Sequence, residues 1–337
     1  MDLGELSTLL VVGATTAYAI GFVAFAFDLA HLADRVGRPA ARLAADASVA
    51  DASEAAASEA AASDGGGARE AGGTTVVAAP ADVVPHRRAV GIAMATTTLG
   101  LAFHGVGLLL RGLAAGRVPW ANMYEFTVVG TFVAVATFLV LTRWRDVRFL
   151  GTIVVGLVVV ALGLGLTVFY VVAEGVQPAL QSYWLVIHVS IATSATGMLT
   201  VSFAASALQL LKDSREQGTA RLLGPRWRAL DALPTPRELE ALSFRITAVG
   251  FVLWTFTVMA GAIWAEHTWG RYWGWDPKEV WSFVVWVVYA AYLHARTTVG
   301  WSGRRAAWFV IVGYATVIAN FTLVNLFFSG LHAYSGL

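Results

Sequence analysis

Long apolar segments recur along this chain of 337 residues, and their length constrains the fold more than any other feature. A helix needs roughly 20 residues to cross the hydrocarbon core of a bilayer. Because backbone groups cannot hydrogen-bond to water there, continuous apolar segments of this length must be helical. We identify them at about 7–30, 88–110, 124–142, 149–171, 183–211, 244–264, 279–297 and 306–328. The sequence therefore predicts an all-α, polytopic membrane bundle of about eight transmembrane helices, the fifth of which projects beyond the bilayer.

The composition agrees with a membrane protein and excludes other classes. Charged residues make up 13% of the chain and apolar residues 57%, whereas a soluble domain carries about 25% charged residues. A net charge of +1 argues against a nucleic-acid-binding protein, which would present a basic face. The chain has no cysteine, which excludes disulfides and thiolate ligands. Any metal or haem iron must therefore be held by histidine, methionine, tyrosine or carboxylate.

The basic residues predict the orientation of the bundle. Of the 23 Lys and Arg residues, 19 fall in the segments after the first, third, fifth and seventh spans. Positive charge marks the cytoplasmic side of a membrane protein, so both termini are expected on the outer face. The first span lacks a basic leader and a small-residue cleavage site, and we expect it to be retained.

Three regions are expected along the chain. Residues 1–39 contain the first transmembrane helix. Residues 40–87 are rich in Ala, Gly, Ser and Asp, a composition that predicts a disordered cytoplasmic loop with at most transient helix. Residues 88–337 form the remaining membrane domain. Within it, the charged, proline-containing segment 212–242 predicts a structured cytoplasmic loop or short surface helices.

Tryptophan is concentrated in one outer-face segment. Six of the 13 tryptophans lie between residues 264 and 286. Interfacial belts account for one or two aromatic residues at a helix end, but not for the alternation of aromatic residues with glycines over 269–276. That alternation predicts an irregular or re-entrant stretch whose rings form a flat surface. A ligand-binding platform is favoured over a simple interfacial belt.

A helix start follows directly after this segment. Asp276 suits the N-cap, Pro277 the first helical position, and Glu279 the third. The seventh span is therefore predicted to begin at Pro277. Asp276 and Glu279 could serve as capping residues and nothing more, and the sequence leaves that interpretation open.

Two histidines are expected at the level of the tryptophan segment. Ionisable groups inside the bilayer are costly and are functional candidates by default. His188 lies in the first two turns of the fifth span, and His332 lies just past the eighth. Their imidazoles, on opposite sides of one aromatic platform, could supply both axial ligands of a haem. The alternative is a pair of hydrogen-bonded structural histidines.

The other histidines are sorted by depth. His294 is 18 residues beyond Asp276, about 27 Å along a helix, so it cannot share that site. It either binds a different haem near the inner face or is a packed or water-facing histidine. His104 is expected to hydrogen-bond a neighbouring helix rather than to stabilise a haem. His267 is a weaker competitor for ligation, and His31 and His86 are expected to be solvated. No metal-protease, Walker or Rossmann pattern appears.

Residues 269–281, followed by 292–296, closely resemble the CcsA/ResC family of cytochrome c biogenesis proteins. These are the tryptophan-rich, WWD-domain components of the system II haem lyase pathway. Further agreement lies in 178–182 with Trp184, in 188–190, in 330–332, and in Pro119 with 122–125. The resemblance spans residues from about 117 to 336.

The resemblance implies that the chain binds haem b, carries it from the cytoplasmic side and presents it at the outer face of the bacterial plasma membrane. The acceptor is apocytochrome c, whose Cys-x-x-Cys-His thiols react with the haem vinyl groups. A ResB-type membrane partner completes the cytochrome c synthetase. His188 and His332 correspond to the outer ligands and His294 to a transmembrane ligand, whose second ligand the partner would supply. The haem-presenting segment comprises Trp269, Tyr272, Trp273, Trp275, Asp276 and Trp281, with Arg271 and Lys278 as candidate propionate contacts.

Two alternatives remain open. A b-type cytochrome exchanging electrons with quinone usually needs two bis-histidine haems, with ligands paired across facing helices, which this chain lacks on its own. A cofactor-free transporter would instead use Glu125, Glu174 or Glu266 in a substrate path. His104 and His267 are outside the pattern of the family, so the resemblance assigns them no role.

Overall fold

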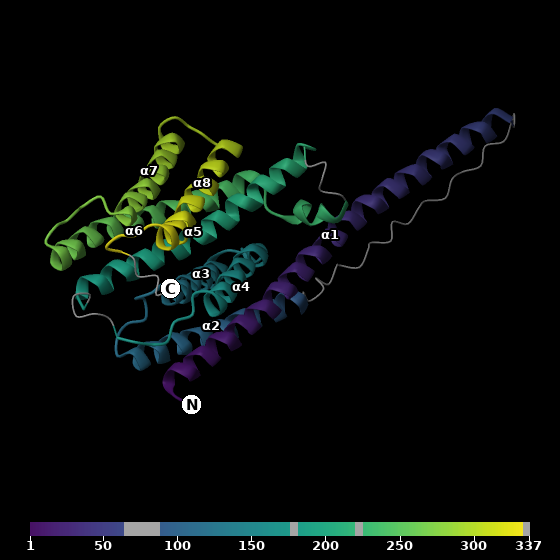
Figure 1. The fold of residues 1–337 in the computed structure, drawn as a ribbon. Helices are drawn as coiled ribbons and strands as arrows, with labels where there is room; N and C mark the ends of the chain where they lie inside the picture. Colours follow the sequence, from purple (N-terminus) through teal and green to yellow (C-terminus); the bar gives the residue numbers. More distant parts are fainter. Residues whose placement is uncertain (64–87, 176–180, 220–224, 333–337) are drawn as a thin grey trace.

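The computed structural model describes residues 1–63, 88–175, 181–219 and 225–332, and this part of the chain is built from helices (Figure 1). The α-helices are α1 (Leu3–Ser63), α2 (Arg88–Ala115), α3 (Met123–Trp144), α4 (Gly151–Thr167), α5 (Tyr183–Glu216), α6 (Pro236–Trp269), α7 (Pro277–Thr297), α8 (Arg304–Phe321) and α9 (Leu323–Phe327). Two 3-10 helices, η1 (Arg148–Leu150) and η3 (Pro225–Ala232), join them. The all-α, polytopic class is confirmed.

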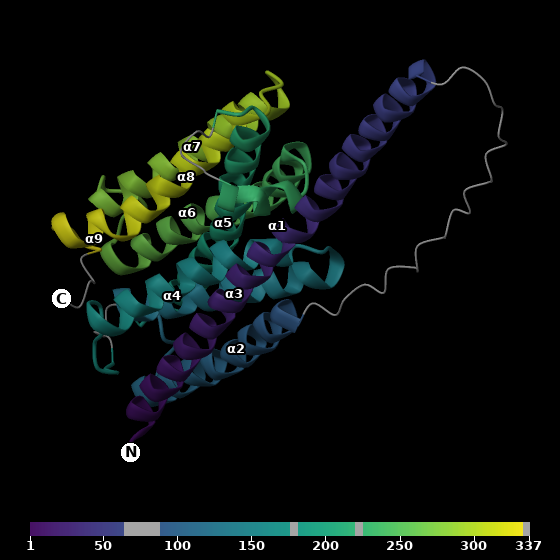
Figure 2. The ribbon, with the colours of Figure 1, turned by 90° about the vertical axis from the view of Figure 1, so that its right-hand side faces the viewer.

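Seven stretches in these ranges are long and apolar enough to cross a membrane, and they lie on α1 to α6 and on α8 with α9. The expected span at 279–297, which is α7, is not among them. This 21-residue helix carries Lys278 and Glu279 in its first turn and four Trp or Tyr residues, which are less hydrophobic than Leu or Val. It runs beside α6 and α8 (Figure 2). Among the described residues, seven helical stretches are thus strongly apolar, and α7 is less apolar than these.

Small residues allow the helices to approach closely, as is usual in membrane bundles. A Cβ at Gly151 of α4 would lie 2.6 Å from the Phe25 ring of α1, and one at Gly250 of α6 would lie 2.8 Å from Leu199 of α5. Between α5 and α6, the buried hydroxyls of Ser202 and Ser243 are 3.0 Å apart. These contacts pack two long helices, α5 and α6, along most of their length.

Helix α1 continues past the first span to Ser63. The expected disorder is therefore not observed over 40–63, where the alanine-rich sequence has a high helix propensity. Residues 64–87, including His86, lie outside the described part of the chain. The segment 212–242 contains η3, as expected, and Arg215 of α5 pairs with Asp231 of η3 at 3.0 Å.

Consecutive helices run in opposite directions, so α1, α3, α5 and α7 begin at the same end of the bundle at which α2, α4, α6 and α8 finish (Figure 2). The tryptophan segment and the residues after α9 meet there. Thr8 Oγ1 of α1 lies 3.4 Å from Tyr170 Oη just after α4. We call this end the tryptophan end of the bundle.

Candidate functional site

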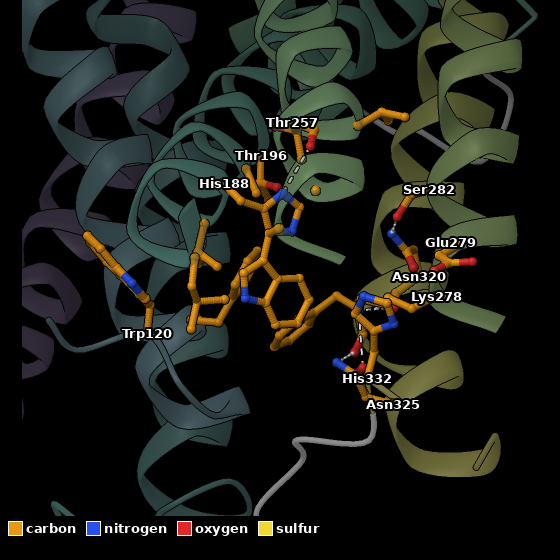
Figure 3. Close-up of a pocket in the computed structure, with 18 of the residues that line it drawn as sticks. Trp120, His188, Thr196, Thr257, Lys278, Glu279, Ser282, Asn320, Asn325 and His332 are labelled. Carbon is orange, nitrogen blue, oxygen red and sulfur yellow. Dashed lines mark hydrogen bonds between the residues drawn. The ribbon is translucent and has the colours of Figure 1, made fainter. Parts of the chain in front are cut away.

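A cavity of about 180 Å³ opens at the tryptophan end of the bundle, between α5, α6, α7 and α8, with the start of α3 and the loop before it on one side. His188 and His332 both line it (Figure 3). Its remaining walls are mainly aromatic and aliphatic, with a polar group formed by Lys278, Ser282, Asn320 and Asn325. The two histidines that the sequence predicts at one level therefore share one cavity.

His188 is held in a defined tautomer by α6. Helix α5 begins after the N-cap Ser182, so His188 lies in its second turn and faces α6. Its Nδ1 lies 2.9 Å from the carbonyl oxygen of Thr257, to which only a protonated nitrogen can donate. Nε2 is left as the acceptor. A Cβ at Gly261 would lie 2.7 Å from the imidazole, so glycine is needed there for the ring to fit.

His332 is held by Asp276, the N-cap residue of α7. Its Nδ1 lies 2.8 Å from Asp276 Oδ1. Burial lowers the pKa of His332 and outweighs the nearby carboxylate, which favours the neutral ring. Burial alone would raise the pKa of Asp276, but hydrogen bonds from His332 and from the Leu331 N–H hold it below its usual value. The neutral ring donates from Nδ1, so Nε2 is again the acceptor.

Trp264 of α6 contacts both imidazoles. Its ring centroid lies 6.1 Å from that of His188, with the planes 4° apart, and 5.5 Å from that of His332. Trp269 packs edge-on against both Trp264 and His332 at 4.8 Å. Trp264 is only 1% exposed. The two histidines and two tryptophans therefore form one aromatic cluster.

The tryptophan segment is irregular, as predicted, but its rings do not form a flat surface. Gly270, with φ 69°, ends α6, and regular helix resumes at Pro277 after the capping box of Asp276 and Glu279. The planes of Trp273 and Trp275 are 89° apart. Edge-to-face packing is favoured because the positive edge of one ring meets the negative face of the next. The rings therefore form a stepped surface, of which Trp264, Tyr272 and Trp273 line the cavity.

Trp275 has a strained backbone. Its φ is 61°, in the left-handed region that costs a bulky residue about 1–2 kcal/mol, and its side chain is 72% exposed. Burial of the indole does not offset this strain. An exposed tryptophan kept in an unfavourable conformation suggests a role in contacts outside the chain.

Replacement of Trp275 by glycine should therefore stabilise the fold relative to alanine. Both variants lose the indole, but only Trp275→Gly relieves the strain, and we expect it to be more stable than Trp275→Ala by about 1 kcal/mol. Thermal unfolding of the two variants in detergent measures the difference. Equal stability, or a more stable alanine variant, would show that the backbone of residue 275 is unstrained.

The two candidate propionate contacts differ in position. Lys278 lines the cavity, and its Nζ donates to the Asn320 carbonyl oxygen at 2.8 Å and to Asn325 Oδ1 at 3.1 Å. Arg271 does not line the cavity and pairs with Glu279, which does, at 3.4 Å. The structure thus brings only the lysine to the two histidines.

The other predicted residues lie apart from the cavity. His294 is exposed near the opposite end of α7, at the depth expected from its spacing. His267 is exposed and lies 3.2 Å from Glu266. His104 is fully buried and lies 3.2 Å from Tyr18 Oη of α1, which confirms the expected hydrogen bond to a neighbouring helix. Trp281 is in the first turns of α7 and does not line the cavity.

Sequence reasoning missed the face of α6 that supports His188. Thr257, Gly261 and Trp264 follow the i, i+4, i+7 spacing of one helix face. This spacing, which ends at the tryptophan segment, is the sequence pattern that could have identified this face of α6. Of the motif at 178–182, residues 178–180 lie outside the described part of the chain.

Comparisons with known proteins identify the family of this chain. Residues 120–332 match the family described as "Cytochrome C assembly protein". The cytochrome c biogenesis protein CcsA of Parasynechococcus marenigrum is 33% identical over 258 residues, which cover 67% of this chain and 81% of the relative. The protein of the same name from Synechococcus sp. (strain CC9311) is 33% identical over 275 residues, which cover 73% of this chain and 87% of the relative.

Among solved structures, "Cytochrome c Heme Lyase CcmF" is similar, with a TM-score of 0.59 and 16% identity. The likeness covers 95% of this chain and 47% of that chain, and at this identity it shows a shared fold alone. The family match covers well over half of the chain. This multi-pass membrane protein therefore belongs to the cytochrome c assembly protein family.

Proposed function

We propose that this chain binds haem b in the cavity and presents it at the outer membrane face for covalent attachment to apocytochrome c. The observation that carries the proposal is the pairing of His188 and His332 on one cavity. Both rings donate from Nδ1, to Thr257 O and to Asp276, and both keep Nε2 as an acceptor. That arrangement suits two axial ligands of one iron. The names of the relatives support haem as the cargo.

The walls of the cavity suit a porphyrin. Trp254, Trp264 and Phe321 provide apolar and aromatic surface, where burial of a flat ring contributes most. The volume is smaller than the roughly 300–1,000 Å³ of typical ligand pockets. We therefore expect side chains at the mouth, among them the exposed Tyr272, to move when haem enters.

The chain binds and orients haem while the acceptor supplies the thiols. Each thiol adds across a haem vinyl group, so that a C–S bond forms and the thiol hydrogen ends on the neighbouring carbon. This addition needs no nucleophile from the present chain, which has no cysteine. Its residues hold the iron between two imidazoles and limit the access of water. The chain is thus a haem-handling subunit of a synthetase.

Lys278 provides a second recognition element. Its ammonium group is half-buried and forms no salt bridge within the described ranges, and its two hydrogen bonds are to neutral oxygens. Partial burial without a paired anion is unfavourable for an ammonium group. A haem propionate is an anion of the right kind. We therefore propose Lys278, rather than Arg271, as the propionate contact.

Haem dimethyl ester, in which both propionates are neutral, tests this contact. Wild-type protein should bind haem about tenfold more tightly than the ester, because a charge-assisted hydrogen bond contributes about 1.5–3 kcal/mol. Lys278→Met should remove that preference, and Arg271→Met should retain it. Spectrophotometric titration in detergent measures both affinities. A preference that persists in Lys278→Met would exclude the lysine as the contact.

The exposed His294 supports a partner at the opposite end. An imidazole on the membrane surface of α7 is costly when it faces lipid. We propose that a ResB-type partner covers this surface and supplies the second ligand of a transmembrane haem, as the family resemblance implies. We also propose that the tryptophan end and both termini face the outer side of the bacterial plasma membrane, as the distribution of basic residues predicts.

The alternatives have less support from the structure. Glu125, a candidate for a transporter path, is fully buried between Arg111 and Arg117. The cavity holds one pair of histidines, His188 and His332, whereas a quinone-linked cytochrome usually needs two facing pairs. Deletion of the gene distinguishes these functions. We expect loss of all c-type cytochromes with b-type cytochromes retained, and normal c-type levels would overturn the proposal.

A further inference from the structure

Asp276 accepts three hydrogen bonds from two parts of the chain. Its Oδ1 accepts from His332 Nδ1 at 2.8 Å and from the Lys278 N–H at 3.1 Å, and its Oδ2 accepts from the Leu331 N–H at 2.7 Å. The residue is 8% exposed. One carboxylate therefore caps α7, fixes the segment after α9 and holds the imidazole of His332.

The segment after α9 is fitted closely to this carboxylate. A Cβ at Gly330 would lie 2.4 Å from Asp276 Oδ2. The backbone of Gly330 is not in the left-handed region, so close approach, and not conformation, requires a glycine here. The close contact of Gly330 with Asp276 thus fixes the position of residues 330–332. Gly330 lies two residues before His332, whose imidazole faces the cavity.

The two proposed ligands are held by different acceptors. His188 donates to a neutral backbone carbonyl, whereas His332 donates to a carboxylate. A hydrogen bond to a charged acceptor is roughly twice as strong as one between neutral groups. A carboxylate behind a ligating imidazole also fixes its tautomer and raises its basicity. His332 should accordingly be the stronger electron donor of the pair.

We propose that Asp276 is a positioning residue for haem binding: it orients His332, fixes its Nδ1–H tautomer and makes it the stronger of two unequal axial ligands. The inference rests on the proposed function. A more basic ligand stabilises ferric over ferrous iron, because hydrogen bonding to a ligand tunes the potential of haem. Asp276 thereby lowers the reduction potential of the bound haem.

Asp276→Asn removes the negative charge of residue 276 but keeps the helix cap. Asparagine is as good an N-cap as aspartate and keeps one acceptor oxygen. We expect about 10- to 100-fold weaker binding of haemin, a more positive reduction potential, and at most a modest loss of thermal stability in the haem-free chain, because α7 stays capped while the Asn NH2 group faces the Leu331 N–H. Haemin titration and spectroelectrochemistry of the purified full-length protein measure the first two. A merely structural cap would change neither.

Gly330→Ala tests placement without changing charge. The added methyl group must displace residues 330–332 from Asp276, and we expect haemin binding to weaken while α7 remains capped. Glu238→Gln is the matched control, because Glu238 forms the capping box of α6 with Thr235 at the opposite end of the bundle. We expect wild-type affinity and potential in that variant.

The outcomes separate the inference from the proposed function. If His332→Ala loses haemin but Asp276→Asn keeps wild-type affinity and potential, then the positioning role is wrong and the proposed function stands. If His332→Ala keeps haemin with an unchanged spectrum, the proposed function itself fails. Wild-type behaviour in Gly330→Ala would also contradict the positioning role, since displacement of the segment would then have no effect.

Discussion

Alanine at His188 or His332 should abolish holocytochrome c formation while the protein remains inserted in the membrane. Each variant removes one of the two imidazoles that face the cavity. Loss of a hydrogen-bonding partner behind a metal ligand already costs about 10- to 100-fold in affinity, so loss of the ligand should cost at least 100-fold. Haem-stained holocytochrome, normalised to membrane-inserted protein, measures the effect.

His267→Ala is the matched control for this experiment. His267 lies at the same end of the bundle, but its Nδ1 bonds to the Ile263 carbonyl oxygen and it does not line the cavity. We expect near-normal holocytochrome levels in this variant. Normal levels in both His188→Ala and His332→Ala would contradict the account, as would an equal loss in His267→Ala.

Glu125→Ala should have the largest effect on stability. Glu125 is fully buried and accepts from Arg111 Nε at 2.9 Å and from Arg117 Nη1 at 2.7 Å. Its removal leaves two guanidinium groups at the tryptophan end without their anion. Breaking a buried ion pair in this way costs about 3–5 kcal/mol. We therefore expect loss of folded protein from the membrane, measured by yield and thermal unfolding in detergent.

Asp146→Ala provides the comparison for Glu125→Ala. Asp146 pairs with Arg148 at 2.6 Å, but its side chain is 59% exposed. An exposed ion pair contributes about 0–1 kcal/mol because water screens both charges. A Glu125→Ala variant as stable as Asp146→Ala would show that the Arg111–Glu125–Arg117 cluster is dispensable. It would also reopen Glu125 as a substrate-path residue.

Features set by local sequence were predictable. Hydropathy identified the helices, and the Asp276-Pro277 pair with Glu279 identified the start of α7, because capping depends on residues three apart. His188 and His332 were expected at the same depth because each lies near the outer end of its transmembrane span. These predictions needed only the rise of a helix and the thickness of a bilayer.

Features set by tertiary packing were not predictable. The contact between Asp276 and His332 joins residues 56 apart, and its geometry depends on where the segment after α9 lies. The role of Gly261 depends on the angle at which α5 crosses α6. The flat aromatic surface was wrong because ring orientation follows contacts between rings and not their order. Helix over 40–63 was expected only as transient structure, because the low-complexity composition was weighed above the helix propensity of alanine.

The most direct test of haem presentation is an absorption spectrum of the full-length protein purified with its partner and with haem supplied. The account predicts a reduced b-type haem spectrum that weakens in His188→Ala and His332→Ala and is unchanged in His267→Ala. A colourless preparation, or a haem spectrum unaffected by either ligand substitution, would contradict haem binding at this cavity.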